Sequence, residues 1–291
     1  MTLSLDDLNK FLAEKVIISD ESYDRLGKKL ADSVKQHLSR LHTPYKRKAK
    51  TLYASEVGAP CVRKLYYRYN EVTPDKPLDT ATILKFAMGF MLEELLLFLM
   101  EEAGYTVTGQ QEQIIFDDGM PEGWVVRGRQ DAVINGKPVD VKTASSNAMK
   151  KFKSEDTLLA DDPFGYIPQL GIYSYDEDKE GYNTGYFLVV NKVTGDLEVT
   201  TISPDTMDAM MPDFHSLVAD MTAPAAPARM PDAMSAPRND GNIPLSFNCG
   251  HCQYKQTCFK DEGGIRSFKY ATGMEVHLVN PAKIPRLEEV T

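Results

Sequence analysis

Two short segments that combine acidic residues with a lysine constrain this chain more than any other feature. The first is Gly-Arg-Gln-Asp at 128–131, and the second is Val-Asp-Val-Lys-Thr at 139–143. They predict β-strands over Val125–Arg129 and residues 138–142, joined by a turn around Asn135-Gly136.

The acidic residues and the lysine of these segments form a candidate site. Asp140 and Lys142 lie two positions apart, so they point to the same face of the strand, and Asp131 lies within reach in the bend. Two carboxylates hold a divalent cation such as Mg²⁺ through hard oxygen ligands. A lysine beside them orients water or stabilises charge that grows on a phosphate. A solvated pair of Asp and Lys has the same pattern, so the motif alone leaves both interpretations open.

This arrangement resembles the active site of the PD-(D/E)xK nucleases, in particular their RecB-like branch. The match runs in the family's order over roughly residues 51–260. It implies an α/β fold, with a mixed central β-sheet flanked by helices as in the restriction-endonuclease-like core. N-terminal helices and a C-terminal region that carries an iron–sulfur cluster would complete that fold.

Two further motifs support the resemblance. Gln169 and Tyr173 match the Q-x-x-x-Y element that follows the lysine strand in RecB-like nucleases. Gly89 lies where the family often carries G-x-x-x-H, and Glu93 replaces the histidine. A helix predicted around residues 167–175 places Gln169 and Tyr173 one turn apart on one face.

A long helix is predicted from Asp79 or Thr80 to Gly104, and it contains two glutamates. The helix is apolar nearly all round, so we expect it to be buried. A buried carboxylate is costly unless it is paired or bound to metal, and family position favours Glu93 over Glu94 as a metal ligand. In the alternative, both glutamates lie on an exposed strip.

Cysteine usage is the second strong signal. The chain has four cysteines, three of them in the pattern C-x2-C-x5-C. In an intracellular protein this pattern favours metal binding over disulfides. Structural zinc sites usually combine two close pairs, whereas here Cys61 lies far from Cys249, Cys252 and Cys258. The set resembles the four-cysteine frame of the CRISPR-associated RecB-like exonucleases and the AddB nuclease domain, which implies a [4Fe-4S] cluster; zinc and free thiols stay open.

Charge limits how the chain would contact nucleic acid. The net charge of −9 argues against non-specific binding over the whole surface, but not against a local basic groove. Basic runs occur within residues 46–50 and at Lys150, Lys151 and Lys153, and Arg63 follows the first cysteine. We expect Arg63, Lys150 and Lys151 to contact DNA, although each also fits a solvated face.

Composition places the chain among soluble globular proteins. It has 291 residues, of which 42% are hydrophobic and 26% charged. The N-terminus reads as an acidic amphipathic helix rather than a signal peptide, and charges interrupt the most apolar stretch, 83–100. We therefore expect a cytoplasmic protein of a bacterium, archaeon or phage-infected cell, with no membrane contact and with oligomerisation left open.

The expected organisation has four segments. Residues 1–50 form an N-terminal helical region, and residues 51–222 form a RecB-like core that includes the first cysteine. A flexible Pro/Ala-rich connector follows at 223–240. Residues 241–291 form a cluster-binding region packed on the core. A single amphipathic helix is expected over 204–221, and another helix within 145–153.

The resemblance implies a divalent-metal-dependent deoxyribonuclease. The chain contains no Walker A sequence, so it would be a stand-alone exonuclease on single strands or DNA ends. Phage DNA metabolism, recombination and CRISPR spacer processing, with their proteins as possible partners, are the biological settings that the resemblance implies.

The alternative is a catalytically weak DNA-binding or assembly module that retains the fold. A third possibility is a zinc-stabilised scaffold. The implied ligands of Mg²⁺ or Mn²⁺ are Glu93, Asp131, Asp140 and the Val141 carbonyl; Lys142 assists catalysis, and Gln169 and Tyr173 position the strand.

Overall fold

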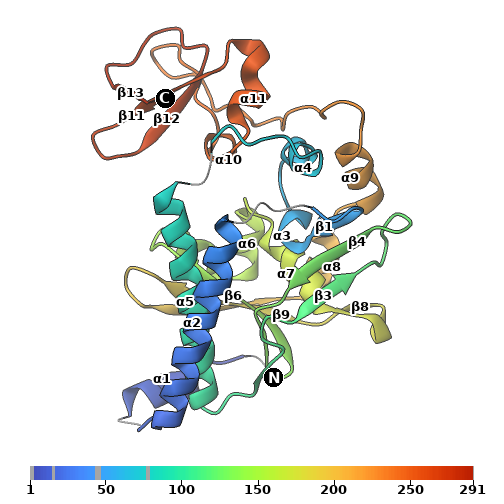
Figure 1. The fold of residues 1–291 in the computed structure, drawn as a ribbon, viewed down its shortest axis with the longest axis vertical. Helices are drawn as coiled ribbons and strands as arrows, with labels where there is room; N and C mark the ends of the chain where they lie inside the picture. Colours follow the sequence, from blue (N-terminus) through green and yellow to red (C-terminus); the bar gives the residue numbers. More distant parts are fainter. Residues whose placement is uncertain (1–2, 15–16, 43–46, 77–78, 291) are drawn as a thin grey trace. The chain divides into compact units, whose positions relative to one another are not determined.

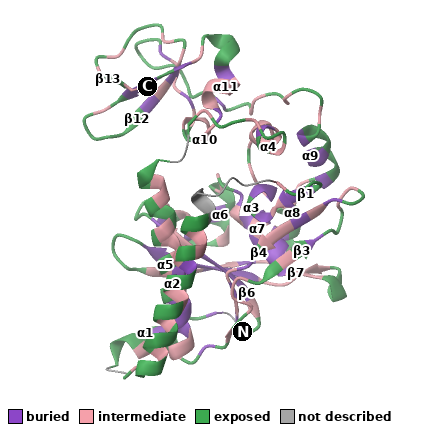
Figure 2. Cartoon of the chain, viewed as in Figure 1, coloured by how far each residue is buried: buried purple, intermediate pink, exposed green. Residues whose placement is uncertain are grey.

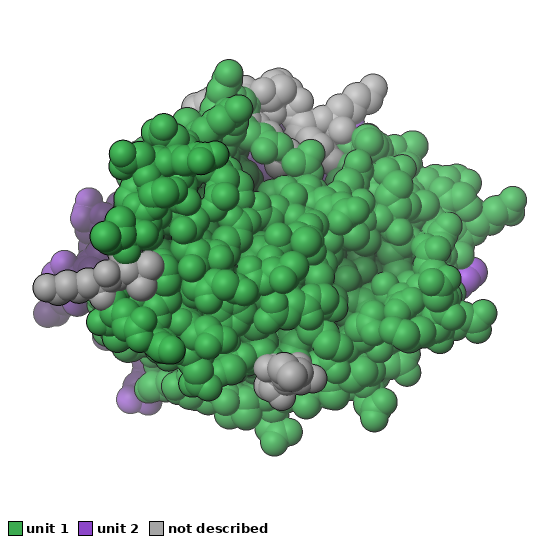
Figure 3. All heavy atoms as spheres, turned by 90° about the horizontal axis from the view of Figure 1, so that it is seen from below, with its two compact units in different colours: residues 1–59, 79–214 green, residues 60–78, 215–291 purple. Residues whose placement is uncertain are grey.

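The computed structural model describes residues 3–14, 17–42, 47–76 and 79–290 (Figure 1). The chain divides into two compact units, one formed by residues 1–59 and 79–214, the other by 60–78 and 215–291. In Figure 3 the two stretches of the first unit form one closely packed body. The division differs from the expected segments, because residues 60–78 belong with the C-terminal region rather than with the core. Within the N-terminal region the apolar pattern predicts a second helix from near Asp20 to Pro44, and the structure has it from Asp20 to His42. Pro44, and Lys46 of the first basic run, lie outside the described residues.

The first unit is mixed α/β, as predicted. In chain order it contains α1 (Asp6–Ala13), α2 (Asp20–His42), β1 (Thr51–Tyr53), α3 (Ala54–Val57), α5 (Thr80–Glu102), β2 (Val107–Thr108), β3 (Gln113–Phe116), β4 (Val125–Arg129), β5 (Ala132–Ile134), β6 (Lys137–Ala144), η1 (Ala148–Lys153), α6 (Glu155–Ala160), α7 (Tyr166–Ser174), β7 (Tyr175–Asp176), η2 (Glu177–Lys179), β8 (Gly181–Tyr182), β9 (Gly185–Asn191), β10 (Leu197–Ile202) and α8 (Pro204–Met210).

The central sheet has the strand order β10-β9-β6-β5-β2. Strands β6 and β9 pair in parallel, whereas β9–β10, β5–β6 and β2–β5 pair antiparallel. Every residue of β9 is buried, because the sheet is covered on both faces. Alternate β9 side chains enter two cores: Leu188 packs with α5, and Phe187 packs with α7 and η1.

The two strands that carry the acidic segments lie in different sheets, which corrects the predicted hairpin. Strand β4 pairs with β1 and β3, whereas β6 pairs with β5 and β9. The turn at Asn135-Gly136 joins β5 to β6, with φ of 50° and 74°. Positive φ at both central residues is the conformation that a two-residue hairpin requires. Asp131 therefore lies where the chain passes from one sheet to the other.

Helix α5 begins as predicted but is less buried than predicted. The Asp79 side chain caps it by accepting a hydrogen bond from the Thr82 amide at 2.7 Å. Its C-terminal half packs on the sheet through Leu96, Leu97 and Met100, whereas its N-terminal half leaves large apolar side chains exposed (Figure 2). The packing partners of this helix, not its composition, decide which half is covered.

The helix expected over 204–221 is interrupted. Helix α8 ends at Met210 and α9 (Phe214–Met221) begins after Pro212. Met211 is extended, with φ −66° and ψ 135°, because the ring of a following proline disfavours the helical conformation. The helix expected within 145–153 is instead a 3-10 helix, η1.

The second unit is smaller and contains a short antiparallel sheet of order β12-β11-β13. Its remaining elements complete the fold: α4 (Val62–Tyr69), α10 (Phe247–Gly250), α11 (Lys255–Phe259), η3 (Lys260–Glu262), β11 (Ile265–Lys269), β12 (Glu275–Val279) and β13 (Glu288–Val290).

The Pro/Ala-rich connector is part of the second unit's packing rather than an undocked linker. Arg63 of α4 donates to the Pro227 carbonyl at 2.8 Å. Arg229 donates to the Cys258 carbonyl at 2.7 Å and lies over the Phe259 ring. Ala233 is buried in the adjoining apolar cluster. Polar bonds to the backbone thus hold a segment that has few apolar side chains.

No helix in the described part of the chain combines the length and apolar character needed to span a membrane.

Candidate metal and nucleic-acid site

Strand β6 places Asp140 and Lys142 on one face of the central sheet, as their spacing predicts. Ala144, two residues further on, belongs to the same apolar cluster as Leu170 of α7, so this face is directed towards α7. Asp140 is 1% exposed and forms an ion pair with Lys142. A buried carboxylate beside an ammonium is the core of the site.

Asp131 joins this pair from the link between β4 and β5. Its Oδ2 accepts a hydrogen bond from the Val141 amide at 2.7 Å. Strand β5 pairs with β6 only as far as Ala132 opposite Val139, so Asp131 occupies the edge of β6 that β5 leaves. The carbonyl of a strand residue points to the same edge as its amide. The Val141 carbonyl therefore lies on the same edge as Asp131.

Glu93 approaches from α5. It is 8% exposed, and its Oε1 accepts a hydrogen bond from Nε2 of Gln111 at 2.7 Å. The charge of Asp140 raises the pKa of Glu93, and the charge of Lys142 lowers it. Glu94 instead interacts with Ser33 and Lys29. The two neighbouring glutamates thus have different surroundings, and Glu93 is the one that joins the acidic cluster.

The sequence reasoning missed Gln111. This residue has φ +56°, an uncommon conformation for a residue other than glycine, and its amide donates to the Asp131 carbonyl at 3.3 Å. It thereby links Glu93 to the Asp131 segment through its side chain and its backbone. No helical or strand periodicity marks a single glutamine in a loop, so the sequence offered no signal for it.

The buried negative charges of the site are not fully balanced by Lys142. Burial, followed by the charges of Asp140 and Glu93, raises the pKa of Asp131 well above its usual range. Burial also raises the pKa of Asp140, against the opposing effect of Lys142. Burial alone would lower the pKa of Lys142, but Asp140 and Asp131 outweigh it and raise that pKa. Burial raises the pKa of Glu93 to about 7, a change that Gln111 opposes and neighbouring acids enhance.

The donor set fits a hard divalent cation. With all groups ionised, three carboxylates and one lysine leave a net charge of −2, and carboxylate and carbonyl oxygens are the ligands that Mg²⁺ and Mn²⁺ prefer. Across the described ranges, however, no three His, Cys, Asp or Glu side chains stand as a ready metal-holding group. The carboxylates here contact protein donors: Gln111 binds Glu93, the Val141 amide binds Asp131, and Lys142 binds Asp140.

Helix α7 supplies the second half of the site. Nε2 of Gln169 donates to the Tyr173 hydroxyl at 3.2 Å, which confirms their shared helix face. Tyr173 is buried against β4, where a Cβ atom on Gly128 would lie 2.6 Å from its ring. Burial and then the Asp140 charge raise the Tyr173 pKa, so its hydroxyl stays protonated. Tyr166, which the sequence reasoning also missed, lies with its ring centroid 4.9 Å from Nζ of Lys142.

We expect Glu93→Gln to weaken Mn²⁺ binding, whereas Glu94→Gln, the matched control, has little effect. The reason is that only Glu93 shares the field of Asp140 and Lys142. Titration of both variants with Mn²⁺, followed calorimetrically, measures the difference. Equal losses in the two variants, or a larger loss in Glu94→Gln, would contradict this placement.

The raised pKa of Glu93 predicts a pH dependence in metal-free protein. Glu93 ionises with a pKa of 4.5 when unperturbed but at about 7 in the fold. The folded state then binds more protons than the unfolded state between these values, so Glu93 makes the fold less stable as pH rises from about 4.5 to 7. Glutamine cannot ionise. The melting temperature of Glu93→Gln relative to wild type, measured in EDTA, should therefore be higher at pH 8 than at pH 5; a constant difference would contradict the prediction.

The second unit gathers the four cysteines. Cys61, Cys249, Cys252 and Cys258 line one cavity, together with Arg63, Lys64, Tyr67, Lys255 and Phe259. Burial raises the pKa of Cys249 to about 11, and the other three thiols contribute to that rise. Among the described residues, however, these thiols do not form a group of three or more that could hold a metal ion as they stand. Cys61 lines the same cavity as the other three cysteines, and a metal cluster at this place stays a prediction.

The predicted DNA contacts are differently placed. Arg63 donates to the Tyr67 hydroxyl and to the Pro227 carbonyl, both at 2.8 Å, so it ties α4 to the following segment. Lys150 is exposed. Lys151 lies 3.7 Å from Asp161 and 5.5 Å from the ring centroid of Phe164. The basic residues of η1 therefore belong to the first unit, whereas Arg63 belongs to the second.

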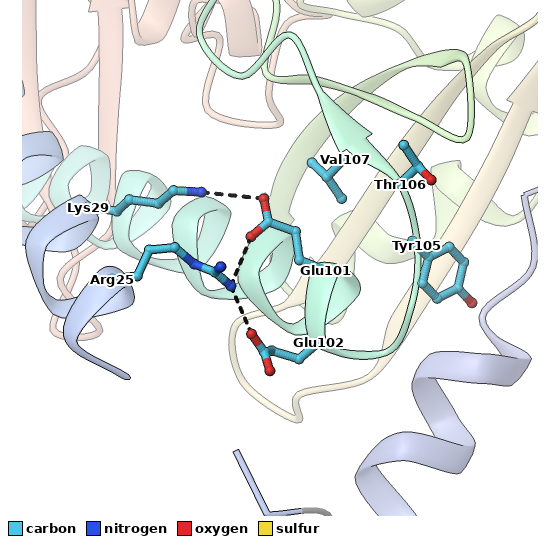
Figure 4. A pocket seen from close by; sticks show the side chains of 7 residues that line it. All are labelled: Arg25, Lys29, Glu101, Glu102, Tyr105, Thr106 and Val107. Carbon is cyan, nitrogen blue, oxygen red and sulfur yellow. Dashed lines mark hydrogen bonds and ion pairs between the residues drawn. The ribbon is translucent and has the colours of Figure 1, made fainter. Parts of the chain in front are cut away.

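Another pocket lies between α2, the end of α5 and β2 (Figure 4). Arg25 lies 2.8 Å from Glu102 and 3.5 Å from Glu101, and Lys29 lies 3.4 Å from Glu101. These ion pairs neutralise its charged lining, so it contributes no acidic cluster of its own.

Comparison with known proteins adds little. No protein-family model matches the chain, and no curated protein matches it. Among solved structures, the crystal structure of SSO0001 is similar at 17% identity and a TM-score of 0.43, over 77% of this chain and 91% of that one. Likeness at this level carries no argument about function, and the resemblance to RecB-like nucleases stays a prediction from the sequence.

Proposed function

We propose that the chain is a divalent-metal-dependent deoxyribonuclease, a stand-alone exonuclease that acts on single strands or DNA ends. The observation that carries the proposal is the convergence of Glu93, Asp131 and Asp140 with Lys142 in one buried site. These residues come from a helix, a link and a strand, and Glu93 of the helix precedes the other three by 38 residues or more. Strongly perturbed pKa values at such a cluster are typical of functional sites.

In phosphodiester hydrolysis, each of these residues would have a separate role. Glu93, Asp131, Asp140 and the Val141 carbonyl would hold one or two Mg²⁺ or Mn²⁺ ions, which polarise a phosphate and lower the pKa of water. Lys142, kept protonated by its acidic neighbours, offsets charge that grows on the phosphate. The protonated Tyr173 hydroxyl and Gln169 supply hydrogen bonds that position the strand.

The four cysteines would hold a [4Fe-4S] cluster in the second unit, with zinc as the competing metal. Hydrolysis transfers no electron, so the proposed role of the cluster is to fix the fold of its unit. A cytoplasmic setting in phage DNA metabolism, recombination or CRISPR spacer processing, with the corresponding proteins as partners, completes the proposal.

A second candidate is a DNA-binding or assembly module with little turnover. The observation that favours it is the engagement of each carboxylate by a protein donor, since a metal would have to displace Gln111 and rearrange Lys142. The two candidates share DNA binding and differ in cleavage.

End-labelled single- and double-stranded DNA, incubated with Mg²⁺, Mn²⁺ or EDTA, tests the proposal. We expect metal-dependent shortening of the labelled strand, faster on single strands, that EDTA abolishes. Binding without cleavage under every metal condition would support the second candidate and exclude the nuclease.

A further inference from the structure

An aromatic ring and a carboxylate both hold the ammonium of Lys142. The carboxylate is that of Asp140, which forms an ion pair with Lys142. The ring is that of Tyr166, the first residue of α7, and its centroid lies 4.9 Å from Nζ of Lys142. A cation within about 6 Å of a ring centroid is attracted by the negative face of the ring. Lys142 therefore has a second partner that does not belong to the acidic cluster.

Packing holds the ring of Tyr166 in place. The ring stacks on that of Phe152, with the two centroids 5.9 Å apart and an interplanar angle of 28°. It packs against the apolar cluster that α7 and the central sheet share. The Asp162 carboxylate accepts hydrogen bonds from the amides of Tyr166 at 2.9 Å and Ile167 at 3.0 Å, so the start of α7 is held as well. The ring therefore keeps its place when the other partner of Lys142 changes.

The proposed function requires such a change. It assigns the Asp140 carboxylate to a divalent cation, so the ion pair with Lys142 weakens when the metal binds. A lysine side chain is long and flexible, and without a fixed partner its ammonium would leave the position beside the phosphate. We propose that Tyr166 is a positioning residue, whose ring keeps the ammonium of Lys142 directed at the scissile phosphate while Asp140 holds the metal. This inference rests on the proposed nuclease function and adds a residue to its site.

The face of the ring, rather than the hydroxyl, provides this attraction. Phenylalanine presents the same face, whereas the aliphatic side chain of leucine has no aromatic face that attracts a cation. Tyr166→Phe should therefore retain the position of Lys142, and Tyr166→Leu should lose it. Tyr182→Leu is the matched control, because Tyr182 packs against the same apolar cluster and the ring beside Lys142 is that of Tyr166.

Cleavage kinetics test the role of the ring on single-stranded DNA with Mg²⁺. Tyr166→Leu should lower kcat by roughly 2- to 30-fold, which corresponds to about 0.5–2 kcal/mol of cation–ring attraction, and should leave KM and Mn²⁺ affinity unchanged. The loss falls on kcat because Lys142 is proposed to offset charge that grows in the transition state. Tyr166→Phe and Tyr182→Leu should cleave like wild type. A loss in either of them as large as that in Tyr166→Leu would overturn the role of the ring.

A double-mutant cycle shows whether Tyr166 acts through Lys142. In Lys142→Ala protein the ring has no ammonium to hold, so the addition of Tyr166→Leu should reduce kcat no further. A further reduction as large as that caused by Tyr166→Leu alone would mean that the ring acts independently of Lys142, and would overturn the proposal.

Nuclear magnetic resonance of lysine-labelled protein tests the contact in EDTA, without cleavage. Protons held over an aromatic face resonate upfield, so the ε protons of Lys142 should be shielded in wild type and Tyr166→Phe but not in Tyr166→Leu. Lys142→Arg identifies the resonance by its loss. The decisive sample is Asp140→Asn, which removes the charge of the carboxylate that the metal would engage. We expect the upfield shift to persist there, because the ring alone holds the ammonium.

The outcomes separate this inference from the proposed function. An unshielded Lys142 in wild type, or in folded Asp140→Asn, would overturn the positioning role even in a protein that cleaves DNA. Shielding that persists in Asp140→Asn, in a protein whose wild type never cleaves DNA, would refute the nuclease and retain the ring as the group that holds Lys142.

Discussion

Asp140→Asn is expected to abolish metal-dependent DNA cleavage, with a loss of at least about a thousandfold, while the protein stays folded. A metal ion contributes several kcal/mol of charge stabilisation in such a reaction, and Asp140 is the most deeply buried of the proposed ligands. The substitution preserves shape and removes the charge that attracts the metal. Asp131→Ala should have the same effect, since Asp131 shares that field.

Cleavage rates and circular dichroism of the variants check this expectation. Asp24→Asn, which neutralises an exposed carboxylate on α2, is the matched control and should cleave like wild type. Asp140→Asn also removes the ion-pair partner of the buried Lys142, so circular dichroism must show that the metal-free variant is folded before its cleavage rate is compared. Near wild-type cleavage by Asp140→Asn or Asp131→Ala would contradict the assignment of the site.

The second large effect concerns the cysteines. If the second unit holds the proposed [4Fe-4S] cluster, wild type is brown when purified, and Cys61→Ala should remove that colour and lower the melting temperature of the second unit by at least about 5 °C. A loss of roughly 1 kcal/mol corresponds to about 4–8 °C in a domain of this size. Cys61 is far from the triplet in sequence, so its ligand bond closes the longest loop. The same result is expected for Cys249, Cys252 and Cys258.

Visible absorption, iron analysis and thermal melting measure this effect. His251→Ala is the matched control, because His251 lies between two of the cysteines but is exposed and bonds to the Phe247 carbonyl. It should retain both colour and stability. A colourless wild-type protein that contains zinc would refute the iron–sulfur cluster. A large reversible change in nuclease rate between oxidised and reduced protein would refute a purely structural role.

The sequence predicted those parts of the fold that depend on local pattern. Strand β4 occurs at the predicted bounds, and β6 covers the residues predicted for the second strand. The start of α5 at Asp79 could also be predicted, because a capping side chain accepts a hydrogen bond from an amide only two or three residues further along the chain. The pairing of Asp140 with Lys142 on one face follows from strand geometry alone.

The parts of the site and fold that were not predicted depend on contacts between residues far apart in the sequence, which local pattern does not encode. Gln111 reaches Glu93 only because its own segment lies against Asp131, and Tyr166 meets Lys142 only because α7 covers that face of the sheet. The packing of the connector relies on Arg229 and backbone carbonyls. The break at Pro212 is an exception, because a proline disfavours the helical conformation of the residue before it whatever the apolar periodicity of the segment.

We propose that Glu93, Asp131 and Asp140 form one divalent-metal site. Electron paramagnetic resonance of Mn²⁺ titrated into wild type and Asp140→Asn tests it most directly, because free and bound ions are counted separately without any need for turnover. The account predicts one or two bound ions per wild-type chain, displaced by Mg²⁺ and strongly reduced in Asp140→Asn. Equal Mn²⁺ binding by the two proteins, or none by either, would contradict it.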